Sequence, residues 1–116
     1  MKDPNFMTLI EISYEFKKKA LLMAKAKNNW LSMKEKKKIV LSRIIERLRT
    51  AEDSEANLTN RAYADKEYED FINEYKTISN TYDASKIDAD AWKAYWESRR
   101  TMEATKREEI KHDVQS

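Results

Sequence analysis

This chain of 116 residues contains no glycine and a single proline, Pro4. Average usage of about 7% would supply roughly eight glycines in a chain of this length. Glycine is the residue that most readily forms left-handed turns, helix C-caps and tight hairpins, so its absence favours long uninterrupted helices. Phosphate-binding loops and dinucleotide-binding fingerprints also need glycine for close backbone approach, and the sequence therefore excludes both.

Apolar side chains in the first long segment recur every three or four residues, which indicates one face of a helix. This seam has a single gap, at Lys37, whose stem can lie along apolar surface while its ammonium group reaches water. Thr8 and Glu11 have the spacing of a capping box. We predict a helix over residues 8–50, with these seam residues: Leu9, Ile12, Phe16, Ala20, Met23, Ala26, Trp30, Met33, Val40, Ile44 and Leu48.

Residues 51–63 are predicted to form the connection. Asp53 or Ser54 can cap a short helix that begins near Glu55. Because no glycine is available for a tight turn, we expect the chain to reverse through this short helical segment.

The second long segment has the sharpest period in the chain. Two sets of side chains, each spaced by seven residues and offset by three, form a heptad pattern: Tyr68, Tyr75, Tyr82, Ala89 and Trp96, interleaved with Phe71, Ile78, Ser85, Trp92 and Arg99. Such a pattern predicts a left-handed coiled-coil seam on a helix over residues 64–112. Residues 79–85 are poor helix formers, but the heptad phase crosses them unbroken, which favours one continuous helix.

If the chain reverses near residue 57, Trp30 lies near Tyr82 and Phe16 near Trp96. The predicted fold is all-α: a long antiparallel helical hairpin or coiled coil with a short connecting helix, in a single helical domain over residues 1–116. Residues 1–7 are expected to be a flexible N-terminal segment, or residues left over from cloning that precede an original start at Met7.

A two-helix hairpin leaves apolar side chains outside the main seam. The first helix also carries Tyr14, Leu22 and Ile39, and the candidate association face consists of Ile10, Leu21, Leu31, Ile45, Ile72 and Tyr95. A wider apolar face calls for further helices. They can come from dimerisation into a four-helix bundle or from a different protein.

Charge is unevenly distributed, although the net charge is only +2. Residues 10–50 hold twelve Lys and Arg against four Asp and Glu, whereas residues 51–98 hold five against twelve. A basic helix can lie against an acidic helix of the same chain, or it can contact nucleic acid or an acidic partner. The candidate basic contact surface consists of Lys34, Lys36, Lys37, Lys38, Arg43 and Arg47.

The sequence offers little chemistry. There is no cysteine, and His112 is the only histidine, in a tail expected to fray. No neighbouring His or Cys completes a metal site. We therefore expect no enzyme activity, no catalytic, cofactor or metal site, and no small-molecule substrate. No apolar run approaches the roughly 18 residues of a membrane span. We expect a cytoplasmic protein without membrane association.

The run Arg61-Ala62-Tyr63-Ala64-Asp65, and the later run from Trp92 to Arg100, resemble a group of small phage and prophage proteins. These are uncharacterised coiled-coil proteins, often encoded in early regions near genes for single-strand annealing and single-strand binding. The resemblance implies two long helices with a short capped helix between them, a phage origin and a host-cell cytoplasmic location. It assigns no functional residues.

Together these features predict a non-enzymatic accessory protein that acts by protein–protein interaction, with itself, with phage replication or recombination proteins, or with a host factor. Two alternatives remain at this point. One is non-specific nucleic-acid binding through the basic first helix. The other is a structural role in the virion.

Overall fold

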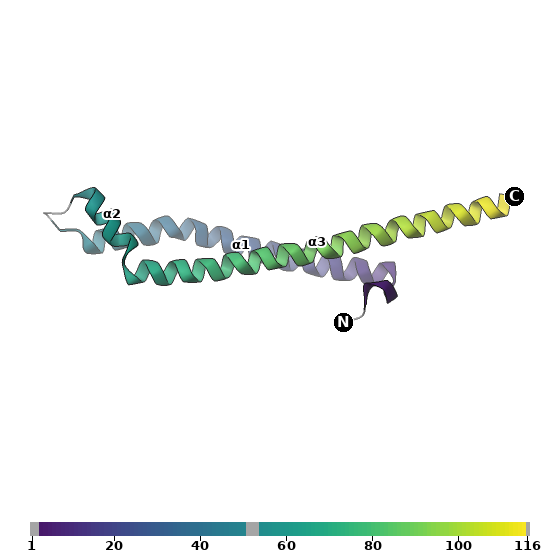
Figure 1. Ribbon diagram of the computed structural model, residues 1–116, viewed down its shortest axis with the longest axis horizontal. Coiled ribbons are helices and arrows are strands. Elements are labelled where there is room, and N and C mark those ends of the chain that lie inside the picture. Colours follow the sequence, from purple (N-terminus) through teal and green to yellow (C-terminus); the bar gives the residue numbers. More distant parts are fainter. Residues whose placement is uncertain (1–2, 51–53, 116) are drawn as a thin grey trace. The chain divides into compact units, whose positions relative to one another are not determined.

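A computed structural model of the chain describes residues 3–50 and 54–115. Within these ranges the elements are a 3₁₀ turn at Pro4–Phe6, then α1 at Leu9–Leu48, α2 at Glu55–Tyr63 and α3 at Lys66–Gln115. No strand occurs in the described ranges. The chain runs along α1, reverses through the short α2 and returns along α3 (Figure 1). The predicted all-α helical hairpin is confirmed.

The helix starts follow local capping chemistry. The Glu11 backbone N–H donates to Thr8 Oγ1 at 3.2 Å and the Thr8 N–H donates to Glu11 Oε1 at 3.3 Å, so the predicted capping box is confirmed. Ser54 is the N-cap of α2, with its Oγ accepting from the Asn57 N–H at 3.2 Å. The alternative cap, Asp53, lies outside the described residues.

Continuity of the second long helix is also confirmed, because α3 passes through residues 79–85 without a break. It ends three residues beyond the predicted 112. Thr77 and Thr81 lie in or next to this weak patch, and their hydroxyls donate to the carbonyls of Asn73 and Thr77 one turn earlier. These bonds satisfy the threonine hydroxyls within the helix itself.

By their contacts, the residues group into two compact units, while the single helical domain expected from the sequence stays a prediction. One, which we call the terminal unit, comprises Met1–Ala24 and Ala84–Ser116. The other, the connection unit, comprises Lys25–Asp83. Each unit contains part of α1 and part of α3, running antiparallel (Figure 1). Each unit therefore combines one stretch of α1 with the stretch of α3 that packs against it.

Three helices contribute to the core of the connection unit. Its buried cluster draws on all of them: Met33, Val40 and Ile44 from α1, Ala62 from α2, and Tyr68 and Phe71 from α3. Leu58 and Ala62 on α2 are both 0% exposed. The connecting helix therefore closes one side of the helix pair, and Trp30 stacks on Tyr82 in the same unit with ring centroids 5.4 Å apart, as the hairpin register predicts.

The terminal unit has a smaller core. Met7, Ile12 and Trp92 are buried there, with Phe16 and Trp96 partly buried against them. The Phe16 and Trp96 rings lie 5.7 Å apart, which confirms the second predicted ring contact. No third helix of this chain contributes to this cluster, whose members lie on α1, on α3 and just before α1.

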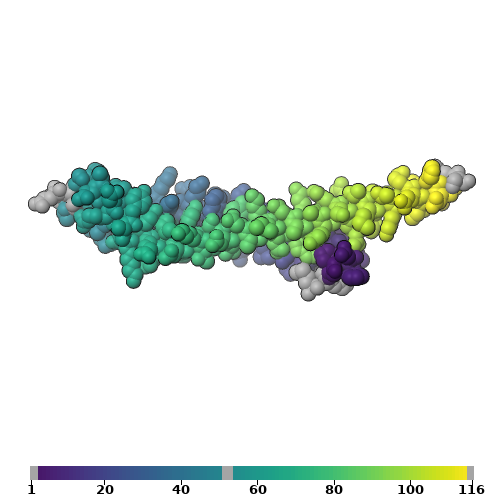
Figure 2. Space-filling view, viewed as in Figure 1, coloured from purple at the N-terminus to yellow at the C-terminus, as the bar shows by residue number. Residues whose placement is uncertain are grey.

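Residues 4–7 of the N-terminal segment make contacts with α3. Arg99 on α3 donates to the backbone carbonyl oxygens of Met7 at 2.5 Å, Asn5 at 3.2 Å and Pro4 at 3.3 Å. The Met7 side chain is buried in the core of the terminal unit. Figure 2 shows these N-terminal residues, in purple, lying against α3. Guanidinium donors and a buried thioether thus hold residues 4–7 in place.

Candidate interaction surfaces

Large apolar side chains remain exposed mainly in the terminal unit. Of the thirteen recorded in the described part of the chain, ten belong to it: Phe6, Ile10, Tyr14, Leu21, Leu22, Ile87, Tyr95, Met102, Ile110 and Val114. The connection unit contributes Leu31, Ile39 and Tyr63. Isolated exposed apolar residues are normal, but a concentration of them marks an interaction surface.

The structure divides the predicted association face. Ile10, Leu21, Leu31 and Tyr95 are exposed at 82%, 68%, 40% and 45%. Ile45 and Ile72 are instead partly buried against the core of the connection unit, so they offer less surface to a partner than the other four residues. The packed surface between the helices of this unit is therefore wider than the heptad seam alone, because residues beside the seam also contact the core.

Four side chains form a stripe on α1 of the terminal unit. Ile10, Tyr14, Lys17 and Leu21 are all exposed and follow spacings of four, three and four residues. Residues at such spacings share one helix face. Leu21 lies nine residues after the buried Ile12, which is about two and a half turns. The stripe, which we call the α1 stripe, therefore faces away from the intramolecular core.

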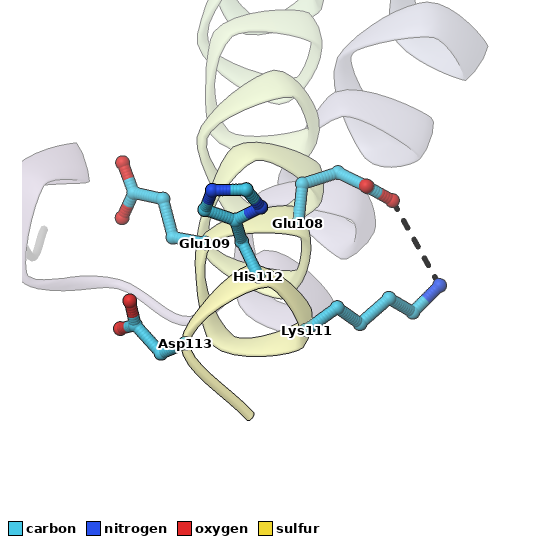
Figure 3. Close-up of a pocket in the computed structure, with 5 residues that line it drawn as sticks. All are labelled: Glu108, Glu109, Lys111, His112 and Asp113. Atoms are coloured by element: carbon cyan, nitrogen blue, oxygen red, sulfur yellow. Dashed lines mark ion pairs between the residues drawn. The ribbon is translucent and has the colours of Figure 1, made fainter. Parts of the chain in front are cut away.

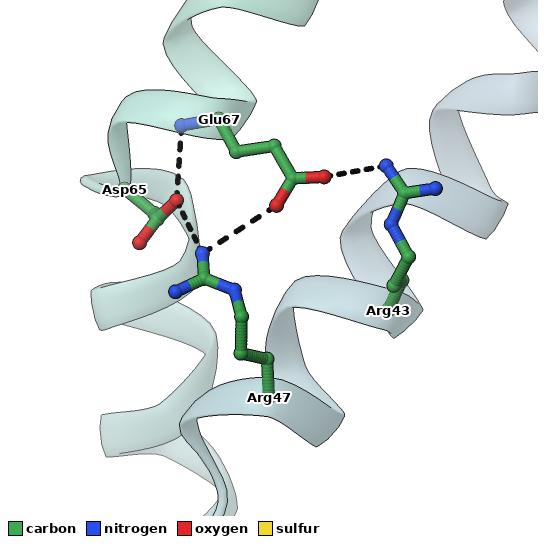
Figure 4. A network of polar contacts seen from close by, with 4 residues as sticks. All are labelled: Arg43, Arg47, Asp65 and Glu67. Carbon is green, nitrogen blue, oxygen red and sulfur yellow. Dashed lines mark hydrogen bonds and ion pairs between the residues drawn. The ribbon is translucent and has the colours of Figure 1, made fainter.

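Two residues of the predicted basic surface are paired with acidic residues in the connection unit. Arg43 contacts the carboxylate of Glu67, and Arg47 contacts Asp65 at 2.7 Å and Glu67 at 3.5 Å (Figure 4). The Arg47 guanidinium, followed by the Glu67 backbone N–H, holds the pKa of Asp65 below its usual value. The hydrogen bond to Asp65 in turn raises the pKa of Arg47. These arginines connect α1 to the start of α3.

The four lysines of that surface have two different environments. The Lys34 ammonium lies 5.3 Å from the Trp30 ring centroid, and the Lys37 ammonium 5.8 Å from that of Tyr75, both within the range of cation–π attraction. The contact of Lys37 fits its predicted place at the gap in the seam. Lys36 and Lys38 are exposed. Four of the six predicted residues therefore already contact an acidic side chain or an aromatic ring of the same chain.

The lone histidine lies in the last turns of α3. His112 lines a surface hollow with Glu108, Glu109, Lys111 and Asp113, all from the same helix (Figure 3). The Lys111 ammonium lies 3.8 Å from Glu108 Oε1. Groups from a single exposed helix do not enclose a ligand, whereas ligand sites are typically concave and lined from several elements. Nothing in this geometry distinguishes His112 from a surface residue.

Sequence reasoning missed the role of Arg99. Its heptad position suggested only a seam side chain, but its guanidinium holds the N-terminal turn by three carbonyl oxygens. A hollow of about 150 Å³ lies beside it, lined by residues that include Pro4, Ile12, Tyr95 and Met102. Arg99 is the only charged residue among the heptad positions from Tyr68 to Arg99, and this was the signal available in the sequence.

The described residues form neither a metal site nor a membrane-spanning helix. They contain no group of three or more His, Cys, Asp or Glu residues placed to hold a metal ion. In the same part of the chain, no helix combines the length and apolar character needed to cross a membrane. Comparison of the chain with protein-family models, with curated proteins and with solved structures gave no match.

Proposed function

We propose that this chain is a non-enzymatic accessory protein that acts by binding other protein chains through its terminal unit. The observation that supports this proposal is the concentration of exposed apolar side chains in that unit, ten of the thirteen recorded in the described residues. Burial of apolar surface is worth about 25 cal/mol per Å². Ile10, Tyr14 and Leu21, each at least 68% exposed, offer much of that surface to a partner.

The connection unit offers an internal comparison. There, α2 supplies a third helix whose Leu58 and Ala62 side chains are fully buried against the helix pair. In the terminal unit the buried cluster consists of Met7, Ile12 and Trp92, with Ala89 also buried, and its described residues include no helix corresponding to α2. A helix from another chain would serve the terminal unit as α2 serves the connection unit.

The experiment is affinity capture of binding proteins from a host-cell extract with the full chain. Tyr14→Gln/Leu21→Gln removes two exposed apolar side chains from the terminal unit. Leu31→Gln/Ile39→Gln is the matched control, because it makes the same kind of change on α1 in the connection unit. We expect the first variant to lose captured protein and the control to retain it. Equal capture by both variants, or no capture and no self-association by the wild type, would contradict the proposal.

The resemblance to phage and prophage proteins suggests that replication, recombination or host proteins are the partners, in the cytoplasm of the host cell. That origin stays a prediction, as does the virion role. Nucleic-acid binding is the weaker alternative, since Arg43 and Arg47 already pair with Asp65 and Glu67.

A further inference from the structure

The α1 stripe combines apolar side chains with a lysine at its centre. Ile10, Tyr14 and Leu21 are exposed, and Lys17 lies between Tyr14 and Leu21 on the same face. A face that enters a lipid surface would be apolar throughout, with its lysines at the margins. A lysine in the middle instead needs a partner that accepts both its stem and its charge.

We infer that the α1 stripe is a two-fold interface, at which a second copy of this chain binds with its own α1 stripe in the antiparallel direction. This inference rests on the proposed function and names one partner. If the two-fold axis passes midway between Tyr14 and Lys17, Ile10 lies opposite Leu21 of the second copy. Tyr14 then lies opposite Lys17 of the second copy, so that the ring receives the lysine stem and ammonium group.

Charges beside the stripe support the antiparallel direction. Glu11 and Lys18 are seven residues apart, so they lie on the same side of the helix two turns from each other. The antiparallel arrangement places Glu11, whose Oε1 also accepts from Thr8 in the capping box, near Lys18 of the second copy, and the symmetry repeats this contact. A parallel arrangement would place Lys17 and Lys18 against their own counterparts, and like charges disfavour it. An isologous contact of this kind also closes after two copies.

Small side chains occupy the other side of the stripe. Ser13, Ala20 and Ala24 lie there at spacings of seven and four residues. Short side chains allow two helix backbones to approach closely. The stripe covers about three helical turns, less than an interface of standard size, which buries about 800 Å² per partner. We therefore expect weak association that depends on protein concentration.

The first test is sedimentation velocity of the full chain over about 1–300 μM, a range in which weak, micromolar association becomes visible. The wild type should change from the monomer mass of 13.8 kDa to twice that value as concentration rises. Leu21→Glu should stay monomeric over the whole range, because two carboxylates would enter an apolar contact. Ile39→Glu, also exposed on α1 but outside the stripe, should associate like the wild type. Circular dichroism of both variants confirms that helix content is retained.

The second test uses the absence of cysteine to determine the direction of pairing. Ile10→Cys and Leu21→Cys are prepared separately, mixed and oxidised. The antiparallel two-fold arrangement predicts a cross-linked dimer in the mixture, and little cross-linking of either variant alone. Efficient cross-linking of Ile10→Cys with itself would overturn the proposed direction.

Three outcomes would overturn the inference, and the first two of them leave the proposed function intact. One is a wild-type chain that is monomeric at every concentration but captures a different protein. The second is a dimer that Leu21→Glu does not weaken. The third is a monomer that binds vesicles of anionic phospholipid through the stripe. Loss of both self-association and protein capture would count against the proposed function as well.

Discussion

At the scale of single residues, Asp65 has two roles at the start of α3. Its Oδ1 accepts from the Glu67 backbone N–H at 2.9 Å, which satisfies one of the amide groups left open at a helix start. The same oxygen accepts from Arg47 Nη2 at 2.7 Å. Both contacts favour the carboxylate and lower the pKa of Asp65 from its usual value of 3.8.

We therefore expect an acid-dependent contribution to stability from Asp65. A carboxyl whose folded pKa is lowered stabilises the fold above its unfolded pKa, and this contribution disappears as pH falls through the folded pKa. The free energy of unfolding, measured by urea titration, should fall between about pH 4.5 and pH 2. The fall should be smaller in Asp65→Asn, which keeps a capping oxygen but has no charge to lose.

Asp65→Ala separates the two roles. It removes the capping oxygen as well as the charge, so it should be less stable than Asp65→Asn at every pH. An Asp65→Asn variant with the same acid dependence as the wild type would show that other carboxylates cause the effect. The cap could have been anticipated from the sequence, but the long-range contact with Arg47 could not, because the register near the connection depends on how α2 folds back.

At the scale of elements, α2 is the part whose packing the sequence described least well. The short helix and its Ser54 cap were predicted, and both are confirmed. Its contribution to the core was not predicted, because a nine-residue helix with two inward side chains has too few turns to show a period. The same omission explains why the sequence did not indicate that Ile45 and Ile72, two residues of the candidate association face, pack against this core.

Leu58→Ala tests whether α2 is a structural part of the connection unit. Removing a fully buried leucine side chain typically costs 2–5 kcal/mol, from lost apolar burial and the cavity left behind. We expect a loss of about 2–5 kcal/mol in the free energy of unfolding, measured by denaturant titration. Ile39→Ala is the control, since that side chain is 65% exposed and its loss should change stability by less than about 0.5 kcal/mol. Equal losses would contradict the described packing.

The N-terminal turn is a second element held by contacts distant in sequence. Arg99→Gln should release residues 4–7, because a neutral amide cannot reproduce three donations to the carbonyls of Pro4, Asn5 and Met7. We expect faster hydrogen exchange of the backbone amides at residues 6–12, measured by mass spectrometry of peptides. Arg107→Gln, an exposed arginine on the same helix, should leave their exchange unchanged. Unchanged exchange in Arg99→Gln would show that burial of Met7 alone holds the turn.

At the scale of the whole molecule, the heptad pattern predicted best which side chains pack between the two long helices. Every heptad position from Tyr68 to Arg99 is buried or half-buried, and the two predicted ring contacts are present. A strict seven-residue spacing over four heptads determines which face of the helix packs against its partner. The surfaces were less predictable, because exposure at Ile10 or burial at Ile45 depends on whether a third helix lies nearby, and the helical period does not contain that information.

The separation of charge between the two long helices leads to the last prediction. Basic residues of α1 face acidic residues of α3 in both units, as in Arg47 with Glu67 at 3.5 Å and Lys19 with Asp88 at 3.1 Å. Opposite charges this close cancel much of each other's field, and salt screens what remains over a Debye length of about 10 Å at 0.1 M. A phosphate backbone would therefore meet a weaker positive potential than the composition of α1 suggests. We expect no gel shift of DNA or RNA at 150 mM salt.

At 50 mM salt, a weak shift should appear only at high protein concentration, because non-specific contacts strengthen as salt falls. Lys36→Glu/Lys38→Glu should abolish that shift, since these two lysines are exposed on the basic helix. Asp65→Asn/Glu67→Gln should instead strengthen it, because removing two carboxylates leaves Arg43 and Arg47 available to phosphate. Tight binding at 150 mM salt, insensitive to either pair of substitutions, would favour nucleic acid as the main ligand. It would also assign protein binding through the terminal unit a secondary role.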